Sequence, residues 1–170
     1  MDALALLESA HRQIEQQLAR VAAIATAAQA DALASLPLTA IQDVLTYFHA
    51  DLPRHTADED LDLFPLVRAV APDLAAVIVG LEADHRAIEF IHGELDGILA
   101  QLLHAQAAGG ARSAQGGSGL GQELQRVTDY VVPFYQRHLR TEERQVFVKA
   151  RSSLTPEQLA ALGDALALRH

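Results

Sequence analysis

Residues 54–64 read RHTADEDLDLF, and residues 137–147 read RHLRTEERQVF. The two stretches share an Arg-His pair, a glutamate four positions after the histidine, and a phenylalanine at the end. A second repeat relates residues 8–15 to residues 82–89, with Glu, His, Arg, Ile and Glu at matching positions. The chain therefore has the pattern of a duplicated helical hairpin, and two such hairpins make a four-helix bundle.

Apolar residues recur at intervals of three or four through most of the chain, which is the period of an amphipathic helix. Four long helices are predicted at residues 3–29, 39–70, 73–106 and 120–151, followed by a short fifth helix. Thr155 is a suitable N-cap for the fifth helix, and Pro156 suits its first position. The sequence thus predicts an all-α fold, an up-down four-helix bundle that occupies residues 1–170 as a single domain.

Short segments interrupt the helical pattern. Residues 31–38 are expected to form a loop, and so are residues 109–121, which are rich in Gly, Ser and Ala. Pro53 and Pro133 fall inside predicted helices, where a proline removes a backbone hydrogen bond, so we expect local kinks. Pro65 is expected either to kink the second helix again or to mark where its last turns become a separate piece.

The composition limits the classes of partner. The chain has 170 residues, a formal net charge of -9 and no cysteine. The negative charge disfavours nucleic acid and anionic membranes, and the lack of cysteine excludes disulfides, thiolate metal sites and a Cys nucleophile. No apolar run reaches the roughly 18 residues of a membrane span, and the first residues lack a secretory signal. We expect a cytoplasmic protein with a small-molecule partner and leave its oligomeric state open.

The repeats select six polar residues from the rest. Of eight histidines, four lie at repeated positions, and two of these, His55 and His138, are followed four residues later by Glu59 and Glu142. Residues four apart lie on the same face of a helix, and the other two histidines lie in apolar rows, so all six side chains should face the core. The candidate ligands are His11, His55, Glu59, His85, His138 and Glu142.

Metal binding explains why such residues would be buried together. A buried glutamate without a partner is costly or takes up a proton, whereas cations turn imidazoles and carboxylates into ligands. Iron, zinc, manganese and copper all accept this donor set, and six ligands suit two ions better than one tetrahedral zinc. Glu59 and Glu142 would bridge the ions. With one oxo or hydroxo bridge, each ion keeps a vacant position for O2, NO or peroxide.

The sequence gives weaker reasons to place other polar residues at the metal site. Glu15 and Glu89 follow repeated histidines by four residues, so each is expected either to ligate directly or, more often, to pair with an arginine or orient an imidazole. His92 is expected to pack in the core or line a channel. Tyr47 and Tyr130 are expected either to hydrogen-bond near the site or to pack.

The remaining charged residues near the motifs are expected at the surface. Arg54 and Arg137 should reach solvent or an acidic neighbour, and three histidines without repeated counterparts should be solvated or locally bonded, namely His49, His104 and His170. An acidic face is expected from Asp58, Asp60 and Glu143, which would be solvated or would attract incoming cations.

Together these motifs resemble the hemerythrin-like, or HHE cation-binding, family. The elements are HRQIE at residues 11–15, His55 to Glu59 with LFP at residues 63–65, DHR at residues 84–86, and His138 to Glu142 followed by Glu143. The resemblance covers residues 7–150 and implies an up-down bundle with a non-haem di-iron site, so the implied cofactors are two iron ions.

Within that family the four-His, two-Glu set is more similar to the di-iron iron–sulfur-cluster repair proteins. Oxygen-carrying hemerythrins have a second histidine where this chain has Glu89, and the repair proteins usually have an N-terminal cysteine-containing extension that this chain lacks. The resemblance therefore implies a centre that binds or reacts with O2, NO or peroxide. Whether it is an enzyme is left open between a sensor or store without turnover and a repair or detoxifying enzyme; a metal-free structural bundle is the fourth alternative.

Overall fold

The computed structural model describes residues 2–107 and 114–169. Within these ranges the chain is almost entirely helical and contains no strand, which confirms the all-α prediction. The α-helices are α1 (Ala3–Gln29), α2 (Leu38–Ala57), α3 (Phe64–Val70), α4 (Ala75–Ala107), α5 (Ala114–Thr141), α6 (Val148–Ser153) and α7 (Pro156–Arg169). Two short 3-10 helices span Leu33–Ser35 and Pro72–Leu74, and two π-helices span Asp58–Leu63 and Glu142–Phe147.

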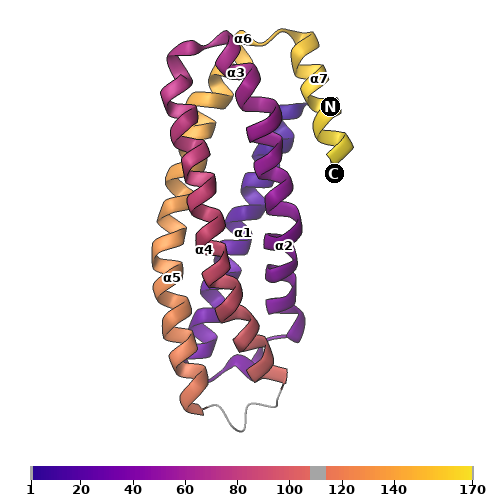
Figure 1. Cartoon of the computed structure of the whole chain (residues 1–170). Helices are drawn as coiled ribbons and strands as arrows, with labels where there is room; N and C mark the ends of the chain where they lie inside the picture. The colour runs from indigo at the N-terminus through magenta and orange to yellow at the C-terminus, as the bar shows by residue number, and fades with distance from the viewer. Residues whose placement is uncertain (1, 108–113, 170) are drawn as a thin grey trace.

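Four long helices lie side by side and form the bundle (Figure 1). Helix α1 packs against α2 and α5, and α4 packs against the same two helices, so the order around the bundle is α1, α2, α4, α5. Helices α3 and α6 continue α2 and α5 at one end, where α7 turns back to pack against α1 and the first π-helix. No helix in the described part of the chain is long and apolar enough to cross a membrane.

The core consists of two apolar clusters with a polar layer between them. Along α1, Leu4 and Leu7 belong to one cluster, whereas Ile14 and Leu18 belong to the other. His11 lies between the two sets, and the same order holds on α4, where His85 separates Leu81 from Ile88. The polar layer is therefore enclosed at both ends by packed apolar side chains, which exclude bulk water from it.

The two π-helices were not predicted. Each is a widened turn with hydrogen bonds to the fifth residue back, a feature that is rare and often found at functional sites. They occupy equivalent places in the repeat, one beginning just before Glu59 and the other at Glu142. Pro65 lies in the first turn of α3, directly after the first π-helix, and the backbone stays helical from α2 through the π-helix into α3.

The prediction of a loop at residues 109–121 was wrong for its second part, because α5 already begins at Ala114. Residues 108–113 lie outside the described residues. Gly121 explains part of the misleading glycine content: a Cβ atom built on it would lie 2.6 Å from the backbone nitrogen of Gln29. This glycine allows α5 to approach α1 closely, so it serves helix packing rather than a turn.

The predicted loop at residues 31–38 does separate two helices, since α1 ends at Gln29, α2 begins at Leu38, and only a short 3-10 helix lies between them. The two interior prolines do not end their helices. Helix α2 continues past Pro53, and α5 continues past Pro133. The fifth helix starts where expected and has reciprocal capping: the hydroxyl of Thr155 accepts from the Gln158 amide at 3.2 Å, and the Gln158 side chain accepts from the Thr155 amide at 2.9 Å. This capping box satisfies two backbone donors that the helix itself cannot.

Candidate metal centre

The six predicted ligands meet in the polar layer of the bundle. His11 comes from α1, His55 from α2, His85 from α4 and His138 from α5, while the two glutamates come from the π-helices. None of the six is more than 7% exposed. The helical spacing inferred from sequence therefore brings all six side chains together inside the protein, as predicted.

Glu59 contacts histidines on both sides of the layer. Its Oε1 lies 3.4 Å from Nε2 of His11 and 3.4 Å from Nε2 of His55. Its Oε2 lies 3.3 Å from Nε2 of His85. One carboxylate oxygen thus faces the His11 and His55 pair, and the other faces α4.

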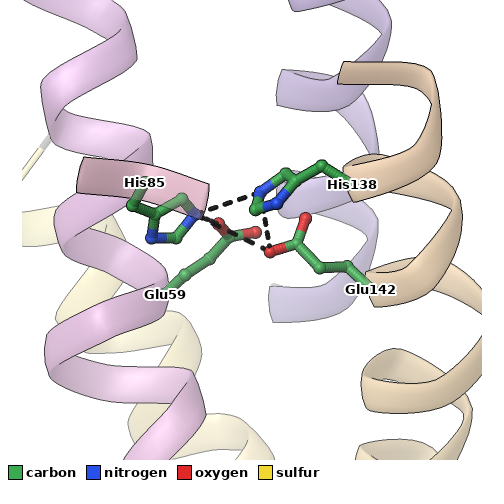
Figure 2. A group of neighbouring side chains, drawn as sticks. All are labelled: Glu59, His85, His138 and Glu142. Atoms are coloured by element: carbon green, nitrogen blue, oxygen red, sulfur yellow. Dashed lines mark hydrogen bonds and ion pairs between the residues drawn. The ribbon is translucent and has the colours of Figure 1, made fainter. Parts of the chain in front are cut away.

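Glu142 has the complementary arrangement. Its Oε2 lies 3.3 Å from Nε2 of His11, and its Oε1 lies 3.2 Å from Nε2 of His138 and 3.8 Å from Nε2 of His85. Figure 2 shows Glu59, His85, His138 and Glu142 pointing toward one another, with Nε2 of His85 and Nε2 of His138 3.1 Å apart. Each glutamate therefore directs one oxygen toward each pair of histidines.

The donor atoms fall into two overlapping groups that could each hold an ion. One contains Glu59, His85, His138 and Glu142, and the other contains His11, His55 and Glu59. Two ligands about 2.1 Å from one ion lie roughly 3.0–3.5 Å apart, for metal–ligand distances typical of imidazole and carboxylate. Most of the contacts between Nε2 and carboxylate oxygens above lie in that range, so the spacing fits metal ligation.

The hydrogen bonds of the polar layer test independently whether its residues fit a bound metal. Oε2 of Glu59, both carboxylate oxygens of Glu142 and Nδ1 of His55 are buried and have no hydrogen-bond partner among the described residues. Buried carboxylate oxygens without donors are costly, and nearly all such groups in folded proteins are satisfied. A bound cation would satisfy the carboxylates, so these residues fit a metal centre better than they fit a packed core.

The electrostatics of the layer are those of a cation site. Burial lowers the pKa of His11, but the carboxylates of Glu142 and Glu59 outweigh it and raise this pKa to about 10. His85 has the same balance: burial lowers its pKa, and Asp60 and Glu59 raise it to about 10. Burial would raise the pKa of Glu59, yet His55, His11 and His85 hold it well below the ordinary value. A metal ion that binds here must therefore displace protons.

Carboxylates outside the layer orient three of the four imidazoles through Nδ1. These pairs are His11 with Glu143 at 3.0 Å, His85 with Asp60 at 2.8 Å, and His138 with Asp84 at 3.4 Å. A carboxylate on Nδ1 favours the tautomer with the proton on that nitrogen, which leaves the Nε2 lone pair directed at the centre. This is the usual arrangement behind a histidine that ligates a metal.

His55 differs from the other three imidazoles. Its Nδ1 is buried and lacks a partner within residues 2–107 and 114–169, and burial lowers its pKa. The repeat explains the difference, because the position equivalent to Asp84 in the first hairpin is Ala10. The duplicated site is therefore symmetric in its six central residues but asymmetric around them.

The prediction that Asp58, Asp60 and Glu143 form a solvated acidic face was wrong. Asp60 and Glu143 accept from the ligand-candidate histidines, as described above. Asp58 is only 3% exposed and pairs with Arg169, which also contacts Asp62 at 2.7 Å. Sequence spacing did not reveal this, because α7 covers Asp58 only after the chain has folded back.

The weaker ligand candidates remain outside the centre. Glu15 is 45% exposed and pairs with Arg12 at 3.3 Å, which is the arginine pairing that the sequence favoured. Glu89 is exposed and lines a groove between α2 and α4. Neither glutamate belongs to either group of donor atoms found among the described residues.

The arginines and remaining histidines behave largely as predicted. Arg54 pairs with Asp51 at 3.0 Å, and Arg137 pairs with Asp84 at 3.3 Å. His49 is exposed and bonds Asp96 at 2.6 Å. His104 is exposed, and His170 lies outside the described residues.

A tyrosine that sequence reasoning missed lies beside the centre. Tyr135 is 1% exposed, and its hydroxyl lies 2.7 Å from Nε2 of His92. Of the two tyrosines selected by the repeat, Tyr47 packs in the apolar core against Phe48, and Tyr130 is 60% exposed. The repeat could not select Tyr135 because its counterpart is a leucine; its place one turn before His138 was the available signal.

Comparison with known proteins agrees with this geometry. The family model described as Hemerythrin HHE cation binding domain matches residues 2–91. A protein of Haemophilus influenzae, described only as uncharacterized, is 26% identical over 136 residues, which cover 78% of this chain and 69% of the relative. The match to the family model covers more than half of the chain, including the first three of the four histidines in the polar layer. The chain therefore belongs to the hemerythrin HHE cation-binding domain family.

Proposed function

We propose that this chain is a non-haem di-iron protein that binds or reacts with O2, NO or peroxide in the polar layer of its bundle. The observation that carries the proposal is the position of the two glutamates, each with one oxygen near the first pair of histidines and one near the second. A single ion would not use both oxygens of both carboxylates in this way, whereas two ions would.

The residues divide naturally between two ions. His11 and His55 would hold the first ion, His85 and His138 would hold the second, and Glu59 and Glu142 would bridge them. Imidazole and carboxylate donors suit iron, and the matching family model describes a cation-binding domain. When bound, a redox-active metal pair with open positions supplies a place for a small oxidant or diatomic gas and the electrons to reduce it.

The chain limits what can reach the centre. A small cavity of about 10 Å³ lies against the layer and is lined by three of the ligand histidines, His55, His85 and His138, together with Thr56, Tyr135 and four apolar side chains. That volume is about what one water molecule needs. The surrounding residues thus favour a diatomic or peroxide-sized ligand over a larger organic substrate.

Metal analysis and absorption spectroscopy test the proposal. Protein purified with iron is expected to contain two iron ions per chain and to show oxo-bridge absorption bands, and an anomalous-scattering map should place both ions among the six ligands. Less than about one iron per chain, without such bands, would contradict the proposal of a two-metal site.

Two variants link the metal to the carboxylates. The double change Glu59→Ala and Glu142→Ala is expected to abolish iron binding, because it removes both bridging ligands. Glu15→Ala is the matched control, since Glu15 lies on α1 near His11 but is exposed and paired with Arg12. Equal iron content in the double variant and the control would show that the carboxylates are not ligands.

Within this proposal, binding without turnover and catalysis remain two alternatives. A sensor or store would bind the gas or iron without consuming it, whereas a detoxifying or cluster-repair enzyme would turn over. Steady-state assays of the iron-loaded protein with O2, NO and hydrogen peroxide separate the two. Negligible consumption of all three would exclude the detoxifying enzyme and favour the sensor or store.

A further inference from the structure

The hydrogen bond between Tyr135 and His92 connects the surroundings of the centre to a groove at the surface. Tyr135 lines the small cavity that is also lined by His55, His85 and His138. His92 lines a larger groove of about 470 Å³ between α2 and α4. The phenol and the imidazole are 2.7 Å apart, so the pair spans the wall between the two spaces.

The wall itself is thin. Four residues line both the small cavity and the groove, namely Leu52, Thr56, His85 and Ile88. His92 is only 7% exposed, and its Nδ1 is buried and has no hydrogen-bond partner in the described part of the chain. A buried polar atom left without a partner calls for an explanation beyond packing.

The repeat indicates that packing does not require this polar pair. The positions equivalent to Tyr135 and His92 in the other hairpin are Leu52 and Leu18, and both leucines are buried in the same apolar cluster. The other half of the bundle therefore has leucine at both of these positions. A buried tyrosine–histidine pair replaces two apolar residues only on the side of α4 and α5.

The surroundings of Tyr135 and His92 determine the protonation state of each side chain. Burial raises the pKa of Tyr135 well above its ordinary value, so the phenol stays protonated. Burial lowers the pKa of His92 to about 4, despite the nearby carboxylate of Asp96, so the imidazole is neutral at pH 7. A neutral imidazole has one nitrogen that accepts a hydrogen bond, and with the ring proton on Nδ1 that nitrogen is Nε2, which faces the phenol.

We propose that Tyr135 is a redox-active residue that gives one electron to the metal centre while its phenolic proton passes to Nε2 of His92. This inference rests on the proposed function and takes hydrogen peroxide as the co-reactant. Breaking the O–O bond to form two water molecules consumes two electrons and two protons from solvent. Tyr135 would supply one of these electrons and a bound, reduced metal pair would supply the other, which would leave a neutral tyrosyl radical and a protonated His92.

Freeze-quench electron paramagnetic resonance of the iron-loaded protein tests this step. After mixing with hydrogen peroxide, the wild type should show a tyrosyl radical, and Tyr135→Phe should remove it while iron content stays unchanged. Tyr130→Phe, which alters an exposed tyrosine on the same helix, is the control and should keep the signal. His92→Leu copies Leu18 and removes the proton acceptor, so radical formation should slow about a hundredfold, as for loss of a positioned base.

The outcomes separate this inference from the proposed function. A protein that binds no iron refutes both. A protein that binds iron and changes its absorption with peroxide, yet forms no tyrosyl radical, refutes only the redox role of Tyr135. A radical that persists in Tyr135→Phe also overturns it, and loss of iron in Tyr135→Phe would assign the residue a structural role instead.

Discussion

The buried imidazole of His92 should give the protein a distinct loss of stability in mild acid. Its ring packs against Phe48 with centroids 4.3 Å apart and bonds Tyr135, so it enters the folded core neutral. Burial lowers its pKa from 6.5 to about 4, with Asp96 opposing this shift and His49 adding to it. The perturbation to test is His92→Leu, which places at this position the residue that the other hairpin has at Leu18.

The direction of the pH dependence of stability follows from how many protons the folded and unfolded states bind. Between pH 6.5 and pH 4 the unfolded chain has His92 protonated, whereas the folded chain keeps it neutral. Acid therefore stabilises the unfolded state, and the contribution of His92 to stability is present above pH 6.5 and is lost as the pH falls. The slope is about 1.4 kcal/mol per pH unit, so the total loss down to pH 4 is about 3 kcal/mol.

The histidines of the centre do not obscure the comparison in metal-free protein, because the lowered pKa of His55 adds the same slope to the wild type and to His92→Leu. His11 and His85 have pKa values of about 10 in the folded chain, so below pH 6.5 they are protonated in both states and add no slope. The stability that protonated His11 and His85 contribute to the folded state is lost instead as the pH rises from 6.5 through 10. Urea unfolding of chelator-treated protein at pH 4, 5, 6 and 7 measures the effect of His92 directly.

The wild type should lose about 3 kcal/mol more than His92→Leu between pH 7 and pH 4. His104→Leu, at an exposed histidine on the same helix, should follow the wild type. Equal pH dependence in the wild type and His92→Leu would show that His92 is protonated in the folded chain, and the reasoning from its burial would fail.

Three further substitutions each remove one contact and should have a measurable effect. Asp60→Ala removes the carboxylate on Nδ1 of His85 and should weaken iron binding by about 10- to 100-fold, measured by competition with a chelator. Arg169→Ala removes an ion pair of buried Asp58 and should lower the unfolding free energy by about 2 kcal/mol in urea. Thr155→Ala removes the cap of α7 and should cost about 1 kcal/mol in the same assay.

Exposed residues away from these contacts supply the controls. Asp129→Ala should leave iron affinity at the wild-type value, and Arg20→Ala should change stability by less than about 0.5 kcal/mol. Iron affinity in Asp60→Ala equal to that of Asp129→Ala would mean that the Nδ1 contact does not orient the ligand. A stability change at Arg169 no larger than at Arg20 would show that α7 does not hold the first π-helix.

The sequence by itself determined the bundle and the six central side chains. Helical periodicity depends only on neighbours three and four residues apart, so it can be read along the chain without knowing the fold. Duplication then selected His11, His55, His85 and His138 from eight histidines, and spacing added Glu59 and Glu142. The structure brings all six together, because each faces the core of its own helix.

Only the tertiary structure decided what surrounds those six residues. Asp60 contacts a histidine 25 positions away, Glu143 one that is 132 positions away, and Asp58 an arginine 111 positions away. These contacts depend on how the helices pack against one another, and the spacing of residues along a single helix does not predict that packing. Tyr135 was missed for a related reason: its counterpart in the other hairpin is Leu52, so the repeat gave no sign that Tyr135 would bond to His92 between α4 and α5.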